Sequence, residues 1–97
     1  MSVRFEWDNQ KAKINRQSHR VSFEEACTVF SDPLARIFDD ESHSTPGETR
    51  EIIIGHSKQR RVLLVCFTEQ RAQVIRIISA RQATGKERRE YEENVSF

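Results

Sequence analysis

The pattern of apolar and polar positions predicts a short strand followed by two helices in the first third of the chain. Apolar and polar residues alternate in "VRFEW" (3–7), which is typical of a strand, and a helix is expected over about 9–18. In "SFEEACTVF" (22–30), Ser22 and Glu25 have capping-box spacing, and apolar residues follow at helical intervals. This second helix is therefore amphipathic and should pack inward.

The remaining two thirds read mainly as strands. After the break at Asp32 and Pro33, "LARIFDD" (34–40) predicts a strand, and the polar stretch 41–48 predicts a mobile loop. Three apolar runs separated by short polar links then predict a meander: "REIIIGHS" (50–57), "RVLLVCF" (61–67) and "QVIRIIS" (73–79). The middle run has no polar face, so we expect it at the centre of the sheet. A capping box at Thr84 opens a final charged helix that runs to about Asn94.

These elements predict one α+β domain over residues 1–97. We expect an antiparallel sheet of about four to five strands, ending in the three-strand meander, with two N-terminal helices and one C-terminal helix. The composition, 36% hydrophobic and 32% charged, suits a thin core under a charged surface. No apolar run of about 18 residues and no signal-peptide pattern is present, so a cytoplasmic protein without a membrane partner is expected.

Charge is distributed unevenly although the net charge is only +1. Between Arg50 and Arg89, ten Lys or Arg residues stand against three Glu residues, while acidic residues gather before and after this segment. The basic half is either a surface for a polyanion or a well-solvated charged surface. Cys27 and Cys66 lack metal-ligand spacing, so we expect reduced thiols, no metal and no cofactor.

The first helix carries a polar stripe in place of an apolar one. Lys11, Asn15 and His19 follow at intervals of four residues, which keeps them on one side of the helix. A histidine of ordinary pKa can accept or release a proton near neutral pH, as general acid–base chemistry requires. The alternative is a solvated face with a histidine near the helix C-terminus, where a positive charge is favourable.

Strand alternation sorts the arginines of the basic half. It predicts that Arg76 shares a face with Ile78 and Ala80, and that Arg50 and Arg76 can lie on the same face of the sheet. Arg81 follows at the end of its strand, where side chains project from the sheet edge.

Converging arginines suit a phosphate. Guanidinium groups bind phosphate bidentately and stabilise the added charge of a pentavalent transition state. The structural alternative is that Arg76 pairs with Glu51 or with a C-terminal glutamate.

A set of short motifs, in order and at consistent spacing from Phe5 to Tyr91, resembles the BrnT family of bacterial ribonuclease toxins. They are "FEWD" (5–8), Lys11, Asn15, His19, "VSFEEA" (21–26), Phe30, Arg50, "IIG" (53–55), "RIISAR" (76–81), Glu87, Arg88 and Tyr91. The resemblance implies a RelE-like fold and an RNA-cleaving activity that arrests growth. It also implies a partner, a BrnA-like ribbon-helix-helix antitoxin. The toxin would contact operator DNA only indirectly, through this antitoxin.

Two positions depart from the family pattern. Arg20 stands where the family usually has a glycine that ends the helix in a left-handed conformation, which costs a non-glycine residue roughly 1 kcal/mol. Asn9 stands where the family tends to have proline, a milder change at the first helical position.

The resulting hypothesis is a metal-free ribonuclease in which the RNA 2′-hydroxyl attacks the adjacent phosphorus. The expected catalytic residues are His19, Arg50, Arg76 and Arg81. The expected substrate-binding residues are Lys11, Asn15, Ser79 and Tyr91. Glu87 is either an alternative base or a helix cap. A second hypothesis is a binding module for nucleic acid or an acidic protein segment that cleaves nothing, and a third is a toxin inactivated by drift.

Overall fold

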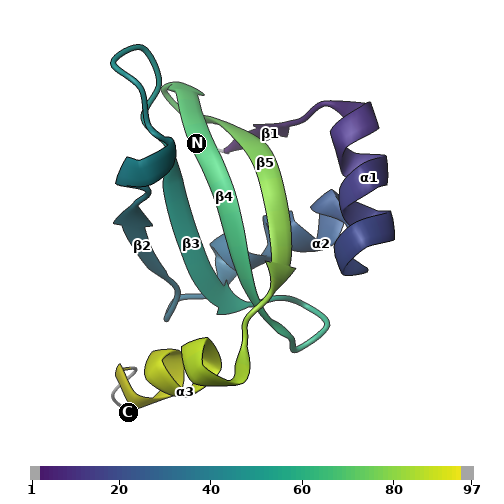
Figure 1. Cartoon of the computed structure of the whole chain (residues 1–97), viewed down its shortest axis with the longest axis vertical. Coiled ribbons are helices and arrows are strands. Elements are labelled where there is room, and N and C mark those ends of the chain that lie inside the picture. The colour runs from purple at the N-terminus through teal and green to yellow at the C-terminus, as the bar shows by residue number, and fades with distance from the viewer. Residues whose placement is uncertain (1–2, 95–97) are drawn as a thin grey trace.

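The computed structural model describes residues 3–94 as a five-stranded sheet with three α-helices (Figure 1). The strands are β1 (Arg4–Glu6), β2 (Arg36–Asp39), β3 (Glu51–His56), β4 (Val62–Arg71) and β5 (Val74–Gln82). The helices are α1 (Asn9–His19), α2 (Phe23–Thr28) and α3 (Gly85–Asn94), with short 3-10 turns η1 (Val29–Ser31) and η2 (Glu41–His43). Within residues 3–94 no helix combines the length and the apolar character needed to cross a membrane.

The sheet is mixed, with the order β1-β5-β4-β3-β2. The predicted meander is confirmed, because β3, β4 and β5 pair antiparallel, and β4 lies at the centre as expected. The prediction of a purely antiparallel sheet is wrong, since β1 pairs with β5 in parallel. Residue alternation reveals that a segment is a strand but not the direction in which it runs. A parallel pair needs a long connection, and the chain between β1 and β5 supplies one. The RelE-like description stays a prediction.

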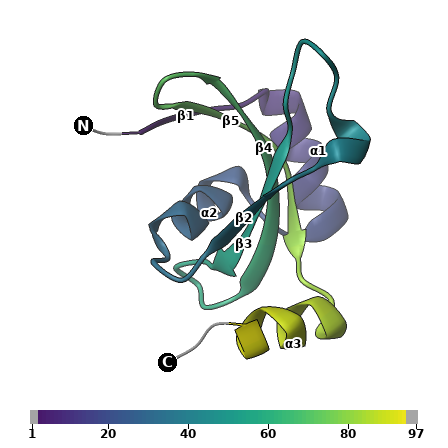
Figure 2. The same ribbon diagram turned by 90° about the vertical axis from the view of Figure 1, so that its left-hand side faces the viewer.

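The main core lies between one face of the sheet and α2 with η1 (Figure 2). Phe23 and Val29 from this helical segment are fully buried against Leu63 and Val65 of β4 and Ile77 of β5. Each such side chain contributes about 1.5–3 kcal/mol by leaving water. The opposite face of the sheet is flanked by α1 and α3 (Figures 1 and 2). Between them, side chains of β3, β4 and β5 line an open hollow, so this is the accessible face.

A one-residue bulge divides β5 into two halves. The pairing with β4 shifts at Ile78, so that Ile77 and Ala80 are both buried in the core although they are three residues apart. Arg76 and Ser79 consequently lie on the opposite, accessible face. The prediction that Arg76 shares a face with Ala80 is therefore wrong, because strict alternation does not allow for the extra residue, whereas Ile78 does lie on the face of Arg76.

The side chains that cap two helices confirm the expected boundaries. The Ser22 hydroxyl accepts a hydrogen bond from the Glu25 amide (3.0 Å), although the Glu25 side chain turns elsewhere. Thr84 and Glu87 form the complete reciprocal box, at 2.8 and 3.1 Å. The second of these caps places α3 directly after β5.

Arg20 adopts the left-handed conformation that the family glycine would take, with φ 59° and ψ 31°. Its amide donates to the Arg16 carbonyl (3.0 Å), and its own carbonyl accepts from the Arg61 guanidinium (3.1 Å). Arg61 also pairs with the buried Glu25 carboxylate, which accepts a further hydrogen bond from Ser57 (2.6 Å). This network fixes the turn between α1 and α2 despite the unfavourable residue.

Candidate active site

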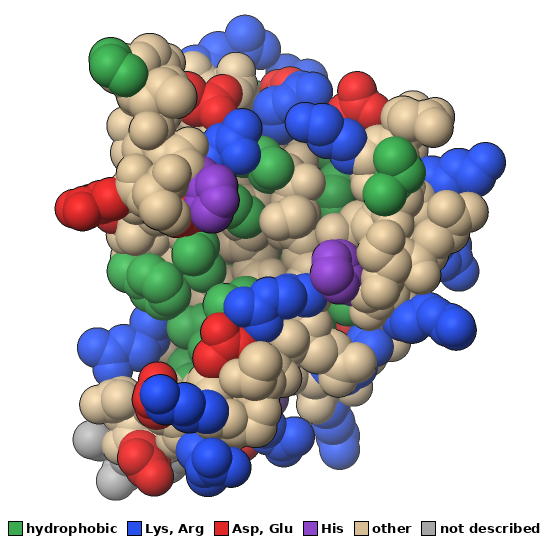
Figure 3. All heavy atoms as spheres, viewed as in Figure 1, with side chains coloured by type: hydrophobic (Ala, Val, Ile, Leu, Met, Phe, Trp, Pro, Cys, Tyr) green, Lys and Arg blue, Asp and Glu red, His purple; other side chains and the backbone are tan. Residues whose placement is uncertain are grey.

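The accessible face of the sheet carries a hollow of about 400 Å³. Figure 3 shows this face, with histidine side chains on two sides of the hollow and lysine or arginine side chains above and below it. The strands form its floor, and charged side chains and histidines form its rim. The lining residues are His19, Asp40, His43, Arg50, Ile52, Leu64, Cys66, Ile78, Ser79, Ala80 and Arg81.

Strand register builds the floor of the hollow. Ile52, Cys66 and Ser79 are paired across β3, β4 and β5, so their side chains stand in one row on one face. Leu64 and Arg81 are paired in the next row on the same face. The bulge in β5 is what directs Ser79 and Arg81 toward the hollow.

Four of the eight predicted site residues gather at this hollow. His19 comes from the end of α1, Arg50 from the residue before β3, and Ser79 and Arg81 from β5. An imidazole, two guanidinium groups and a hydroxyl thus surround one water-accessible space. This combination suits a phosphate group that undergoes proton transfer.

Asn15 lies in the interior, only 6% exposed, and not on the hollow. Its amide nitrogen donates to the carbonyls of Val21 (3.0 Å) and Ala80 (2.9 Å), and its amide oxygen accepts from the Ala80 amide (3.1 Å). The side chain therefore occupies the edge of β5 and ties α1 to it. Because His19 follows one turn later, Asn15 sets the position of the histidine.

Tyr91 also lies away from the hollow. It is 4% exposed within a second apolar cluster that includes Ile54 and Val62, and its hydroxyl donates to Asp32 (2.9 Å). Burial and the neighbouring Asp32 carboxylate raise the pKa of Tyr91 to about 12. Its position anchors α3 to the sheet.

Arg76 and Lys11 do not line the hollow either. Arg76 lies on the accessible face but pairs with Glu6 of β1 (2.8 Å), in place of the Glu51 or C-terminal partner considered from the sequence. Both side chains of this pair are more than a third exposed, so the ion pair contributes little stability. The Lys11 amide donates to the Asp8 cap of α1 (3.0 Å), and its side chain is exposed.

The Arg81 guanidinium is held by Glu87 in a bidentate ion pair, at 2.8 and 3.0 Å. Hydrogen bonds from Arg81 and from the Thr84 amide lower the pKa of Glu87 to about 2, against the effect of desolvation. A carboxylate with so low a pKa is a poor base at neutral pH. Of the two roles left open for Glu87, the geometry supports the helix cap and the orientation of Arg81.

Sequence reasoning missed two side chains at the rim of the hollow, Asp40 and His43. The Asp40 carboxylate contacts His43 Nδ1 (2.9 Å), accepts from the Ser42 hydroxyl (3.0 Å) and lies 3.7 Å from Cys66 Sγ. The polar composition of residues 41–48, which include His43, predicts a mobile loop, and Asp40 ends the strand predicted before it. The available signal is an aspartate three residues before a histidine, upstream of Arg50, the first arginine of the basic half.

Local interactions shift the pKa values of Asp40 and Cys66 in opposite directions. Burial opposes the charge on Asp40, but hydrogen bonds from Ser42 and His43 outweigh it, so the pKa of Asp40 is lowered and the carboxylate is ionised at neutral pH. Burial and the Asp40 charge raise the pKa of the Cys66 thiol. Cys66 is therefore a protonated lining residue and a poor nucleophile.

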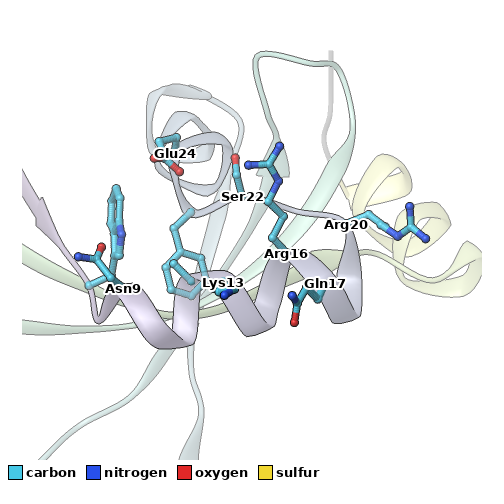
Figure 4. A pocket seen from close by; sticks show the side chains of 10 residues that line it. Asn9, Lys13, Arg16, Gln17, Arg20, Ser22 and Glu24 are labelled. Atoms are coloured by element: carbon cyan, nitrogen blue, oxygen red, sulfur yellow. The ribbon is translucent and has the colours of Figure 1, made fainter.

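A larger groove of about 810 Å³ runs between α1 and α2 (Figure 4). Helix α1 also supplies His19 to the hollow. Figure 4 shows Arg16 reaching from α1 toward the start of α2, while Arg20 extends from the end of α1. Lys13 and Glu24 also line it, but none of its lining residues is a histidine or a cysteine. The groove thus offers cations but no imidazole for proton transfer, which makes the hollow the better candidate for chemistry. No three His, Cys, Asp or Glu residues within 3–94 form a group suited to a metal ion.

Comparison with known proteins agrees with the resemblance noted in the sequence. A family model described as "Ribonuclease toxin, BrnT, of type II toxin-antitoxin system" matches residues 7–87. The chain belongs to the BrnT family. The family is thus one of ribonuclease toxins, and its type II toxin–antitoxin system implies an antitoxin partner. The match includes every residue that lines the hollow.

A solved BrnT toxin has the same fold. The 1.1 Å crystal structure of the Brucella abortus ribonuclease toxin BrnT is similar with a TM-score of 0.65 and 21% sequence identity, over 86% of this chain and 99% of that one. At this identity the likeness supports a shared fold. Among curated proteins no sequence matches this chain.

Proposed function

We propose that this BrnT-family chain is an endoribonuclease toxin that cleaves RNA at the hollow without a metal ion and thereby arrests growth. The observation that supports the proposal is the convergence of His19, Arg50, Ser79 and Arg81 on one accessible space. These residues come from three separate elements, and each is of a type that a phosphate-transfer site requires.

The proposed reaction is attack of the RNA 2′-hydroxyl on the adjacent phosphorus, with departure of the 5′-oxygen. Arg50 and Arg81 hold the phosphate and stabilise the added negative charge of the transition state. Each guanidinium has five N–H donors, so pairing with Glu48 or Glu87 leaves donors for a phosphate. Ser79 donates a hydrogen bond to a non-bridging oxygen, and His19 transfers a proton. DNA lacks the attacking hydroxyl and is not cleaved.

The test is cleavage of purified RNA in EDTA, followed by analysis of the product ends. Wild type is expected to leave 2′,3′-cyclic phosphate, and His19→Ala and Arg81→Ala are expected to lose activity by roughly 10²-fold or more. Arg88→Ala is the matched control, because Arg88 also pairs with a glutamate (2.8 Å) but lies on α3 away from the hollow.

The competing binding module gives a different result in the same experiment. RNA binding shared by wild type and His19→Ala, without cleavage by either, would support that module. Cleavage abolished by EDTA would refute the metal-free reaction and leave the ribonuclease assignment of the family in place.

We further propose that the antitoxin is a BrnA-like ribbon-helix-helix protein that places an acidic segment over the hollow and alone contacts operator DNA. Charge complementarity with Arg50 and Arg81 supports this docking. Arg50→Glu is expected to weaken copurification with the antitoxin more than Arg76→Glu does, because Arg76 does not line the hollow. Unchanged complex formation by this pair of variants would place the antitoxin elsewhere.

A further inference from the structure

His43 stands on the rim of the hollow, on a different element from His19. It ends η2, directly before the turn to β3, whereas His19 ends α1. We propose that His43, oriented by Asp40, is a second catalytic residue that acts as general base opposite His19 as general acid. This inference rests on the proposed ribonuclease function and adds a residue to it.

The contact with Asp40 determines which nitrogen of His43 is free. Nδ1 lies 2.9 Å from the Asp40 carboxylate. An ionised carboxylate only accepts hydrogen bonds, so Nδ1 carries the proton, and the neutral ring keeps a lone pair on Nε2. Nε2 has no hydrogen-bond partner among the described residues, and the side chain is 65% exposed. The imidazole therefore presents a free acceptor nitrogen that a substrate can reach.

Asp40 is held firmly enough to orient the ring. Its side chain is only 10% exposed and accepts from Ser42 as well as from His43. Its amide donates to the Arg50 carbonyl (2.9 Å), and its carbonyl accepts from the Ser44 hydroxyl (2.9 Å). The Ser44 hydroxyl in turn accepts from the Arg50 amide (2.9 Å), so the turn after β2 is bonded to the residue before β3, which supports a preorganised Asp–His pair.

The charged groups around the two histidines favour different roles. His43 faces the Asp40 carboxylate, and the other charged or titratable residues on the hollow are Arg50, Arg81, Cys66 and His19. Asp40 stabilises the imidazolium that forms when His43 accepts a proton. His19 lies in the last turn of α1, where the helix dipole favours a positive charge, so it suits the acid.

The proton balance of the step is complete with these two residues. His43 Nε2 takes the proton of the 2′-hydroxyl as the bond from O2′ to phosphorus forms. The bond from phosphorus to O5′ breaks, and the leaving oxygen takes a proton from the His19 imidazolium. The products are a 2′,3′-cyclic phosphate and a 5′-hydroxyl. His43 then releases its proton to water and His19 takes one up.

The variants that test this inference are His43→Ala, Asp40→Asn and His56→Ala. His56 is the matched control, because it also lies near an aspartate, Asp32 (3.6 Å), but is not on the hollow. Thermal unfolding of each variant checks that it folds. His43→Ala is expected to reduce kcat on RNA by roughly 10²–10⁴-fold with little change in KM. Asp40→Asn, a positioning variant, is expected to lower kcat without raising KM.

A substrate with a good leaving group separates the two roles. A uridine 3′-phosphodiester of 4-nitrophenol needs no acid to expel its leaving group, so His19→Ala should retain most activity on it while His43→Ala stays impaired. Imidazole added to His43→Gln should restore part of the RNA cleavage.

Three results would overturn the inference. The first is His43→Ala activity within threefold of wild type while His19→Ala is inactive, which leaves the ribonuclease proposal standing. The second is a reversed pattern on the activated ester, which would make His43 the acid. The third is the absence of cleavage by wild type, which removes the ribonuclease proposal itself.

Discussion

Replacing Asn15 with alanine is expected to lower the free energy of unfolding by about 3 kcal/mol. The side chain makes three buried hydrogen bonds, to the Val21 carbonyl and to both backbone groups of Ala80, at 2.9–3.1 Å. Alanine leaves all three backbone groups without that partner, and each such buried group costs about 1–3 kcal/mol. We take the lower end, about 1 kcal/mol each, because water can enter the space that the amide vacates.

The change is large for a domain of this size. Small domains unfold with about 5–15 kcal/mol, and for 97 residues each kcal/mol corresponds to about 4 °C or more in Tm. A fall in Tm of about 12 °C or more is therefore expected. Trp7 is the only tryptophan and packs edge-on against Phe23 (5.9 Å between ring centres), so its fluorescence reports unfolding in urea.

Gln17→Ala is the control, since Gln17 is a polar residue on the same helix but exposed. Asn15→Asp should be at least as destabilising as Asn15→Ala at neutral pH, because a carboxylate would face two carbonyl oxygens. A loss below 1 kcal/mol for Asn15→Ala, combined with weaker RNA binding, would contradict the structural role. It would return Asn15 to the substrate-binding role predicted from the sequence.

Three further substitutions probe the supports of the site. Glu87→Gln removes a carboxylate whose pKa is held at about 2, chiefly by Arg81. The contribution of this carboxylate to the free energy of unfolding is full above pH 4.5 and is lost as the pH falls toward 2. The stability of the variant in urea should therefore depend less on pH between these values than that of wild type. Because Glu87 is about a third exposed, the contribution is expected to be about 1–2 kcal/mol. Arg61→Ala leaves the Glu25 carboxylate buried without its cation and should cost about 3 kcal/mol in urea unfolding. Arg20→Gly relieves a left-handed residue and should raise Tm, with a gain of up to about 1 kcal/mol.

Each of these outcomes has a clear contrary result. An acid-unfolding profile of Glu87→Gln that overlays wild type would mean that the Arg81 pair is not formed in solution. Equal stability of Arg61→Ala and wild type would show that water solvates Glu25. Arg60 also has a positive φ, 64°, in the turn after β3, and Arg60→Gly serves as the comparison for Arg20→Gly. A loss of stability in both would contradict the strain argument.

Local signals in the sequence predicted most of the secondary structure. The capping box at Thr84 and Glu87 fixed the start of α3, and the apolar run of β4 identified the central strand, because caps and burial leave their signature in neighbouring residues. The parallel pairing of β1 with β5 had no such signature. It depends on contacts between residues about 70 positions apart, such as Arg4 with Val74.

The candidate site was predictable only in part, because residue types can be recognised locally but their meeting in space depends on the fold. Residue types suited to a phosphate singled out His19 and Arg81, and both line the hollow. Helical spacing also grouped Asn15 with His19, but spacing cannot tell that Asn15 faces a strand edge while His19 remains exposed. His43 lay in a stretch whose composition predicts a loop, and only the folded turn brings it beside Asp40.

The extra residue at Ile78 gives β5 a tolerance of length that a regular strand lacks. Deleting Ile78 would remove the bulge and restore simple alternation, with Ile77 and Ala80 still in the core and Ser79 and Arg81 still on the accessible face. Loss of this one residue should therefore be tolerated in functional descendants of this chain, whereas deleting one residue from β3, whose pairing is regular, would turn the rest of that strand over. A one-residue gap in an alignment can in this way be harmless at a bulge and disruptive in a regular strand.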